Sequence, residues 1–284
     1  MVLASLKSLV PASLKSVIRE SLGVAHLQTR LADAEAQLNV VKQHLDANKA
    51  PPPPAAPMPI TREVIAAQFL RGTGLEIGAL HNPTRLPPGV RARYVDVAPI
   101  EVLRARFPEG GERITVPDIV DNGEELKSVA ESSQDFVIAN HFLEHCEDPI
   151  GAVKNFIRVL KPGGIIFMAV PDKRFTFDLP RDVTSTDHVI EDHLKGPETS
   201  RRAHYDEWLR IIDKKSGEEL AHLTELFLRD RVNIHFHVWT FQEMFELFSA
   251  ARGRLGLPFD IKMALLDPSC LEVVWVLEVT KGRA

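Results

Sequence analysis

The sequence predicts an α/β fold, namely a Rossmann-like, doubly wound, mostly parallel sheet with a C-terminal antiparallel hairpin and an N-terminal helical segment. The chain has 284 residues, of which 44% are hydrophobic, enough for a sizeable core. From residue 60 onward, short and nearly continuous apolar runs alternate with helical patterns. Such runs are typical of strands that are covered on both faces by helices. The last two runs, 259–266 and 271–280, predict the hairpin.

Residues 1–50 are expected to be helical and to contain a short coiled coil. Seven small or apolar residues alternate in spacings of three and four, as in an a/d heptad seam: Val24, Leu27, Leu31, Ala34, Leu38, Val41 and Leu45. In a parallel pair, Arg30 would face Glu35 of the second copy. We therefore expect a homo-oligomer, with a solitary surface helix as the alternative.

The two segments beside this seam differ in character. Residues 1–20 are weakly basic and amphipathic but broken at Pro11, so contact with a membrane surface and a frayed helical extension both stay open. Residues 51–59 contain six prolines and predict a stiff linker before a domain at 60–284.

No apolar run reaches the ~18 residues of a membrane span. Lys7 interrupts the one stretch that resembles a signal peptide.

Charge and cysteine content narrow the function classes. The formal charge of −5 leaves no basic excess for general nucleic-acid binding. Two cysteines, Cys146 and Cys270, are too few for a disulfide framework, which favours the cytoplasm.

The elements of the domain follow in order. A helix is expected at 62–71, strands at 74–78, 91–97, 114–120 and 135–140, a helix at 149–160 and a strand at 164–170. Residues 173–235 form a polar insertion that is a candidate substrate or lid region. Thr240 and Glu243 predict a capping box that opens a helix at 241–250.

The ends of the parallel strands should carry the chemistry, because doubly wound sheets bind ligands at their carboxyl edge. Gly78 follows the first strand and would let the backbone approach a ligand. Asp96 ends the second strand, where an acid accepts two ribose hydroxyls. This pair occurs in any nucleotide-binding sheet of this kind, and a solvated loop acid is the alternative for Asp96.

A longer motif is more specific. Residues 134–172 read QDFVIANHFLEHCEDPIGAVKNFIRVLKPGGIIFMAVPD. In order and spacing, this segment resembles the class I S-adenosylmethionine (SAM)-dependent methyltransferases of the type-11-like branch. The resemblance extends over residues 74–172 and returns at HVWT, residues 237–240.

The resemblance implies SAM as the cofactor and assigns roles by position. Glu76, Gly78 and Ala79 match the loop under the methionine part of SAM, Asp96 the ribose-binding acid, Asp118 and Ile119 the adenine segment, and Asn140 the position beside the methionine. The family commonly has glycines at alternate positions of the first loop, where this chain has Leu80 and Asn82. Leucine adopts a left-handed conformation poorly, so we expect this loop to differ locally.

Histidines supply candidate acid–base groups. Methyl transfer is an in-line displacement, so the enzyme mainly positions donor and acceptor, and a general base assists a hydroxyl acceptor. His141 and His145 are the catalytic candidates. The acceptor candidates share the insertion or its edge: His188, His193, Arg201, Arg202, His204, Tyr205 and His237. Their mixture favours a polar small molecule or glycan that accepts the methyl group at oxygen, with a solvated lid as the alternative.

A metal site is an open but not favoured expectation. Residues 141–145 match H-x-x-E-H, the pattern of an inverted zinc peptidase, although five residues match easily by chance. Related ubiquinone-biosynthesis O-methyltransferases resemble E-x-x-E-H here and are associated with a divalent ion. His141 replaces their first glutamate, which makes Mg²⁺ less natural.

Two other function classes remain as rivals. A nicotinamide oxidoreductase lacks support, because no G-x-G-x-x-G occurs and neither tyrosine has a lysine four residues later. A non-catalytic methyltransferase-fold scaffold that oligomerises through the coiled coil is the alternative to an enzyme. SAM binding distinguishes the two.

Overall fold

The computed structural model describes residues 32–39, 60–267 and 271–282. The chain forms two units, residues 1–59 and 60–284. In the first unit, residues 32–39 are helical and exposed. The other positions of the predicted seam, the segment 1–20 and the linker 51–59 lie outside the described residues, so the coiled coil and the oligomer stay predictions.

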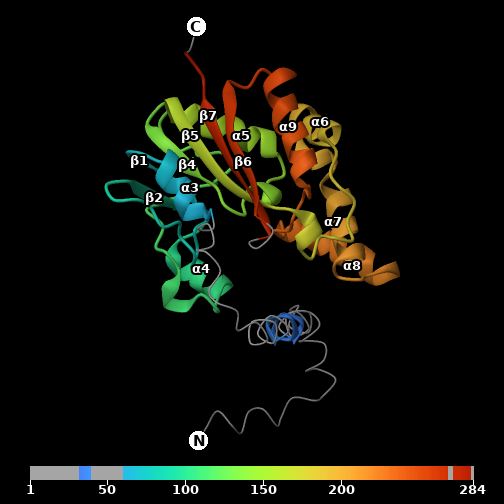
Figure 1. Cartoon of the computed structure of the whole chain (residues 1–284). Helices are drawn as coiled ribbons and strands as arrows, with labels where there is room; N and C mark the ends of the chain where they lie inside the picture. The colour runs from blue at the N-terminus through green and yellow to red at the C-terminus, as the bar shows by residue number, and fades with distance from the viewer. Residues whose placement is uncertain (1–31, 40–59, 268–270, 283–284) are drawn as a thin grey trace, which may run out of the picture. The chain divides into compact units, whose positions relative to one another are not determined.

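The second unit is built on a seven-stranded sheet with the order β3-β2-β1-β4-β5-β7-β6 (Figure 1). The strands are β1 Thr73–Ile77, β2 Arg91–Asp96, β3 Ile119–Val120, β4 Gln134–Ile138, β5 Leu160–Pro171, β6 Phe259–Asp267 and β7 Glu272–Val279. β1 to β5 pair in parallel, whereas β7 lies antiparallel between β5 and β6. The predicted doubly wound sheet with a closing hairpin is confirmed.

Helices flank this sheet (Figure 1). They are α3 Arg62–Phe69, α4 Ile100–Arg106, α5 Pro149–Val159, α6 Thr186–Lys195, α7 Arg201–Ile211, α8 Gly217–Asp230 and α9 Phe241–Gly253. The capping box of Thr240 and Glu243 opens α9 as predicted. Among the described residues, no helix has both the length and the apolar character needed to cross a membrane.

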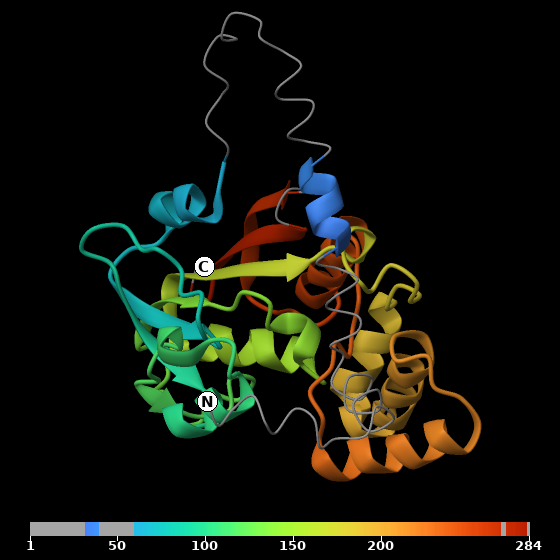
Figure 2. The ribbon, with the colours of Figure 1, turned by 90° about the horizontal axis from the view of Figure 1, so that it is seen from below.

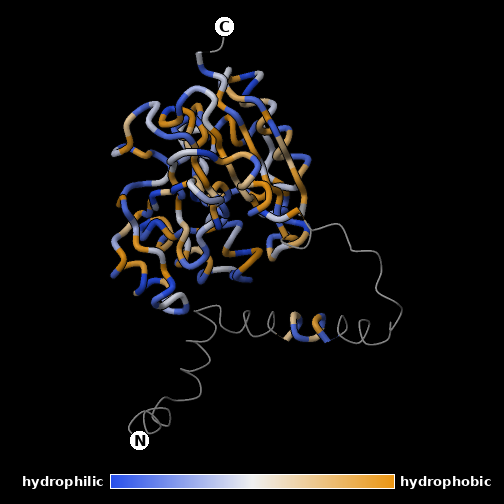
Figure 3. Tube along the Cα trace, turned by 60° about the vertical axis from the view of Figure 1, so that its left-hand side comes forward, coloured by the Kyte–Doolittle hydropathy of each residue, from blue (hydrophilic) through white to orange (hydrophobic). Residues whose placement is uncertain are grey.

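Alternate residues of the central strands face different helices. Phe136 and Ile138 of β4 pack in one cluster with Ile65 of α3. Val137 of β4 packs in another cluster that includes Phe156 of α5. This second cluster also contains residues of α6 and α9. Apolar (orange) stretches of the trace run through the domain accordingly (Figure 3). The site-bearing strand ends are thus held by a sheet that is buried on both faces.

Two predicted boundaries were wrong. The strand expected at 114–120 is reduced to β3, Ile119–Val120, because Pro117 has no N–H to donate to a neighbouring strand. β5 begins at Leu160, directly after α5 ends at Val159, so the Lys161–Gly164 stretch belongs to the strand rather than to a separate turn.

The insertion at 173–235 contributes α6, α7 and α8. These helices (gold to orange) gather beside one end of the sheet (Figure 2). α6 packs on α5 and α9, and α7 packs on α8. Tyr205 of α7, Ile234 and Phe236 form a small separate core. The insertion is therefore a packed extension of the domain rather than a solvated loop.

Candidate active site

A cavity of ≈ 540 Å³ opens where the parallel strands end. Its lining includes Gly78 after β1, Asp96 at the end of β2 and Asn122 after β3. His141 and His145 line it after β4, and Tyr205 and Phe236 line it from the insertion and its edge. The carboxyl edge of the sheet thus carries the cavity, as expected for a doubly wound fold.

The first loop adopts left-handed conformations in spite of its missing glycines. Gly78 has φ 63°, and a Cβ added there would meet no atom within 4 Å. Leu80 has φ 44°, a conformation that leucine adopts poorly. Its side chain packs against the cluster of Leu103 and Ile114, and its carbonyl accepts a hydrogen bond from Thr115 N at 2.7 Å. Apolar packing and this bond offset the backbone strain.

Glu76 and Asn140 hold the first loop through Thr84. Glu76 is 2% exposed, and its Oε1 accepts hydrogen bonds from the backbone N (2.8 Å) and Oγ1 (2.7 Å) of Thr84. Burial raises the pKa of Glu76, and the Thr84 bonds oppose that rise. Asn140 Nδ2 donates to Thr84 Oγ1 at 3.0 Å, and its Oδ1 accepts from Ala169 N at 3.0 Å. Neither side chain lines the cavity. Their predicted SAM contacts stay predictions, as does that of Ala79.

Asp96 lies in the cavity wall at the end of β2. Its Oδ1 accepts a hydrogen bond from Val97 N at 2.8 Å. Burial raises the pKa of Asp96, against the opposing effects of the Val97 bond and the Arg106 charge. The carboxylate therefore has acceptor capacity left for a ligand on the cavity side.

The residues around β3 lie at different distances from the cavity, and the predicted adenine contacts of Asp118 and Ile119 stay predictions. Asp118 Oδ2 accepts a hydrogen bond from Tyr94 N at 2.8 Å, and neither Asp118 nor Ile119 lines the cavity. Asn122 and Glu124, which follow β3, line it instead. Burial raises the pKa of Glu124 to about 7. Sequence reasoning missed both residues, although a strand ending at 120 already placed them at the carboxyl edge.

The ring of His141 lies between two carboxylates. It has φ 49°, and its Nε2 lies 2.8 Å from Oε2 of Glu272, which also forms an ion pair with Arg62 at 2.6 Å. Its Nδ1 lies 3.6 Å from Glu144 Oε1. Burial alone would lower the pKa of His141, but the Glu272 bond and the two carboxylate charges raise it overall.

His145 has one ring nitrogen fixed by two acceptors. Its Nδ1 lies 3.0 Å from Oδ1 of Asn233 and 3.0 Å from the carbonyl oxygen of Ile234. Because both partners are acceptors, Nδ1 carries the proton and Nε2 has a lone pair. Burial lowers the pKa of His145. An imidazole with this tautomer can accept a proton at Nε2.

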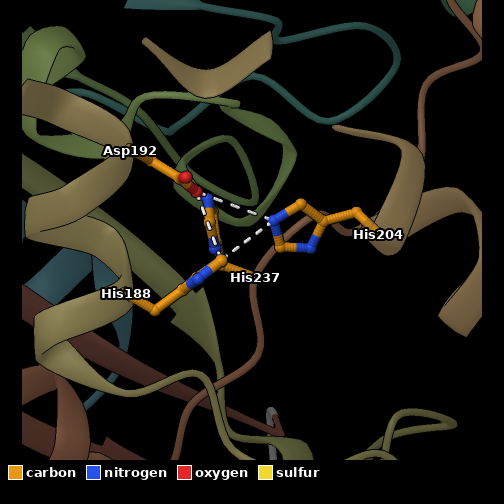
Figure 4. Close-up of side chains that lie close together, drawn as sticks. All are labelled: His188, Asp192, His204 and His237. Carbon is orange, nitrogen blue, oxygen red and sulfur yellow. Dashed lines mark hydrogen bonds and ion pairs between the residues drawn. The ribbon is translucent and has the colours of Figure 1, made fainter. Parts of the chain in front are cut away.

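Of the seven predicted acceptor residues, only Tyr205 lines the cavity. Its hydroxyl donates to the carbonyl of Val232 at 2.9 Å. The charged candidates have partners elsewhere: His193 Nδ1 is 2.9 Å from Asp148, Arg201 pairs with Glu147 at 2.6 Å, and Arg202 pairs with Glu225 at 2.7 Å. His188, His204 and His237 meet at Asp192 (Figure 4). The acceptor roles of these residues stay predictions.

Two groups of side chains could hold a metal ion among the described residues. The first is Glu144, His145 and His235, which offer ligand atoms within 4.8 Å of one another. The second is the group of Figure 4. The inverted-peptidase pattern is not assembled, because residues Leu143–His145 form a 3-10 turn and His141 pairs with Glu272.

Comparison with known proteins supports a methyltransferase. Residues 72–168 match a family model described as a methyltransferase domain. No curated protein matches the chain.

Similar solved structures include two SAM-dependent methyltransferases. One, from Methanosarcina mazei, has 18% identity, covers 75% of this chain and 95% of that chain, and has a TM-score of 0.39. The other, from Aquifex aeolicus, has 10% identity, 73% and 81% coverage and a TM-score of 0.37. A protein of Rhodobacter sphaeroides named as a zinc-dependent alcohol dehydrogenase has 16% identity, 77% and 88% coverage and a TM-score of 0.46.

Proposed function

We propose that this chain, whose residues 72–168 form a methyltransferase domain of the class I SAM-dependent type, transfers a methyl group to an oxygen of a polar small molecule or glycan. The observation that carries the proposal is that His145, with Nδ1 fixed by the carbonyl of Ile234, lies in the wall of the same cavity as Gly78 and Asp96. A hydroxyl acceptor needs a base beside the donor site, and His145 has the tautomer and the pKa direction of one.

The donor site would use the strand ends of β1 and β2. SAM, when bound, supplies an electrophilic methyl group on a sulfonium centre. Asp96, which lines the cavity, would accept hydrogen bonds from the ribose hydroxyls. Gly78 would let the backbone approach the donor, because the space beside its Cα is open.

His145 would take the proton of the acceptor hydroxyl at Nε2. The Nδ1–H bond to Ile234 keeps the ring in this tautomer and shares the positive charge that develops on it. Tyr205 of the insertion and Phe236 at its edge line the same cavity and belong to one apolar cluster. His141, whose Nε2 lies 2.8 Å from Glu272 and whose pKa is raised by that contact, would orient the acceptor rather than remove its proton.

The polar part of the lining supports a polar acceptor. Arg106, Glu124, Glu147 and Arg231 all line the cavity. Arg231 lies 3.4 Å from Glu147, and both side chains keep further hydrogen-bonding capacity. A sugar or polyhydroxylated compound offers both donors and acceptors to such a wall. Because two cysteines are too few for a disulfide framework, we propose the cytoplasm as the compartment of the protein.

Calorimetric titration of the full chain with SAM and with S-adenosylhomocysteine tests the donor site. We expect both to bind, followed by methyl transfer in a screen of sugars and small hydroxylated compounds. Folded protein that binds neither compound would support the non-catalytic scaffold instead, and the N-terminal seam would become its main feature. SAM binding with methyl transfer to nitrogen or carbon acceptors alone would overturn the oxygen acceptor but not the enzyme.

A further inference from the structure

Four side chains of the insertion and its edge converge away from the cavity lining; we call them the histidine cluster: His188, Asp192, His204 and His237 (Figure 4). His188 and Asp192 lie four residues apart on α6 and therefore share one face of that helix. His204 comes from α7, and His237 from the chain just before α9. The cluster thus joins three segments that are distant in the sequence.

The spacing of the ligand atoms fits a tetrahedral ion. His188 Nε2 lies 3.1 Å from His204 Nε2 and 3.2 Å from Asp192 Oδ2. His204 Nε2 lies 3.7 Å from Asp192 Oδ2. Zinc–ligand bonds of about 2.0–2.1 Å in a tetrahedron place ligand atoms about 3.3–3.4 Å apart. One ligand atom from each of the four residues lies within 4.8 Å of all the others.

Burial leaves one nitrogen of the cluster unpaired. Asp192 is 1% exposed and His237 is fully buried. Among the described residues, His237 Nδ1 has no hydrogen-bond partner, whereas Asp192 Oδ2 lies close to His188 and His204. His237 Nε2 faces the carbonyl oxygen of Glu147 at 3.3 Å, which leaves a lone pair on Nδ1. A buried polar atom without a partner is unfavourable, and an ion at the centre of the cluster would pair this nitrogen.

The donor atoms of the cluster suit a cation. Three imidazole rings and one carboxyl group offer ligand atoms within 4.8 Å of one another. Imidazole nitrogen and carboxylate oxygen are the donors that zinc takes in proteins alongside thiolate sulfur.

We propose that the histidine cluster binds one Zn²⁺ ion through three imidazole nitrogens and one carboxylate oxygen of Asp192. Imidazole with carboxylate suits zinc better than Mg²⁺ or Ca²⁺, which prefer oxygen ligands. Four protein ligands fill a tetrahedral site and leave no position for water or substrate, so the ion is structural. It fastens α6 and α7 to the segment that carries Phe236, a residue of the cavity wall.

Metal analysis and cobalt titration of the full chain test this proposal. We expect about one zinc ion per purified chain. After removal by a chelator, Co²⁺ should restore one site per chain with the intense visible absorption of tetrahedral coordination. The thermal midpoint should fall on chelation and recover with Zn²⁺, because the ion binds the folded state alone.

His188→Gln is the informative variant, since the His188 side chain is 35% exposed and its loss leaves no buried hole. We expect it to lose the cobalt absorption and the zinc-dependent rise of the thermal midpoint. His193→Gln is the matched control, because His193 lies on the same helix but pairs with Asp148. It should retain both.

Three results would overturn the proposal. The first is that the folded wild-type protein binds neither Zn²⁺ nor Co²⁺. The second is that His188→Gln keeps the cobalt absorption of the wild type. The third is that the spectrum of the bound cobalt is that of octahedral rather than tetrahedral coordination. Metal that survives His188→Gln but is lost in His235→Gln assigns the ion to Glu144, His145 and His235 instead. SAM titration of the same samples is independent of these outcomes.

Discussion

The cavity at the strand ends and the histidine cluster are both rich in histidine, yet their architecture differs. In the cavity, His145 has one nitrogen fixed by Ile234, and the ring borders open space of ≈ 540 Å³. In the cluster, His188 and His204 have their Nε2 atoms 3.1 Å apart, facing each other rather than a void. A histidine that acts on a substrate needs space beside its lone pair, whereas one that binds an ion needs other lone pairs aimed at the same point.

Replacing the base of the cavity gives the largest expected effect. His145→Gln should lower the rate of methyl transfer by about 10²–10⁴-fold, the usual contribution of a general base. SAM affinity should stay close to that of the wild type. Single-turnover kinetics with an acceptor from the screen would measure this, with His222→Gln on the exposed face of α8 as the control. An unchanged rate would remove His145 from the mechanism.

Removing the charge at the end of β2 should have the next largest effect. Asp96→Asn should weaken SAM binding by about 1.5–3 kcal/mol, the value of hydrogen bonds to a charged group. Calorimetry measures the change directly. Asp118→Asn is the comparison variant, because Asp118 bonds the backbone of Tyr94 and does not line the cavity. If Asp118→Asn weakens SAM binding more than Asp96→Asn, the donor lies elsewhere along this edge.

Two glycine variants distinguish the effect of backbone strain on stability from the effect of a lost contact with SAM. Gly78 and Gly111 have φ 63° and 52°, and a Cβ at either would meet no atom within 4 Å. Alanine at either position should cost about 1–2 kcal/mol of unfolding free energy through the left-handed backbone. Only Gly78→Ala should also reduce SAM affinity, since Gly78 lines the cavity. Equal SAM affinities in the two variants would argue against donor contact at this loop.

The smallest effect is on the pH dependence of stability. Burial lowers the pKa of His145, His204 and His237, so for the metal-free chain their stabilising contribution is present above the unfolded pKa of about 6.5 and is lost as the pH falls below it. His141 acts in the opposite sense, because its pKa is raised. The thermal midpoint should therefore fall between pH 7 and about 5.

One histidine contributes at most about 1.4 kcal/mol per pH unit. His204→Gln should flatten the dependence by less than that amount, and thermal melts across the pH range would measure it. A steeper acid dependence in His204→Gln than in the wild type would contradict the assigned direction of the shift.

Periodicity and turn chemistry predicted most of the fold. The alternating apolar runs located the sheet, and Thr240 with Glu243 located the start of α9. Where prediction failed, a single residue decided the outcome. Pro117 shortened β3, and the packing of Leu80 against Leu103 compensated for a backbone conformation that leucine disfavours.

Less of the candidate site than of the fold could be predicted from the sequence. Asp96 ends one strand and His141 and His145 follow another, and strand ends can be predicted from the sequence. The histidine cluster is not visible in this way, because His188, His204 and His237 meet only when α6 and α7 pack beside the chain before α9. The same limit applies to the fixed tautomer of His145, which depends on Asn233 and Ile234, far away in the sequence.

The position of β7 has a consequence for how the protein is made. Residues Glu272–Val279 fill an interior place of the sheet, between β5 and β6. During synthesis, the edge of β5 that pairs with β7 therefore stays unpaired until this late segment has left the ribosome. Trp275 and Leu277 complete the core that α5 and α9 also cover, so a nascent chain is exposed to aggregation until that moment. Chaperone binding and protease sensitivity of stalled chains should drop only after β7 emerges.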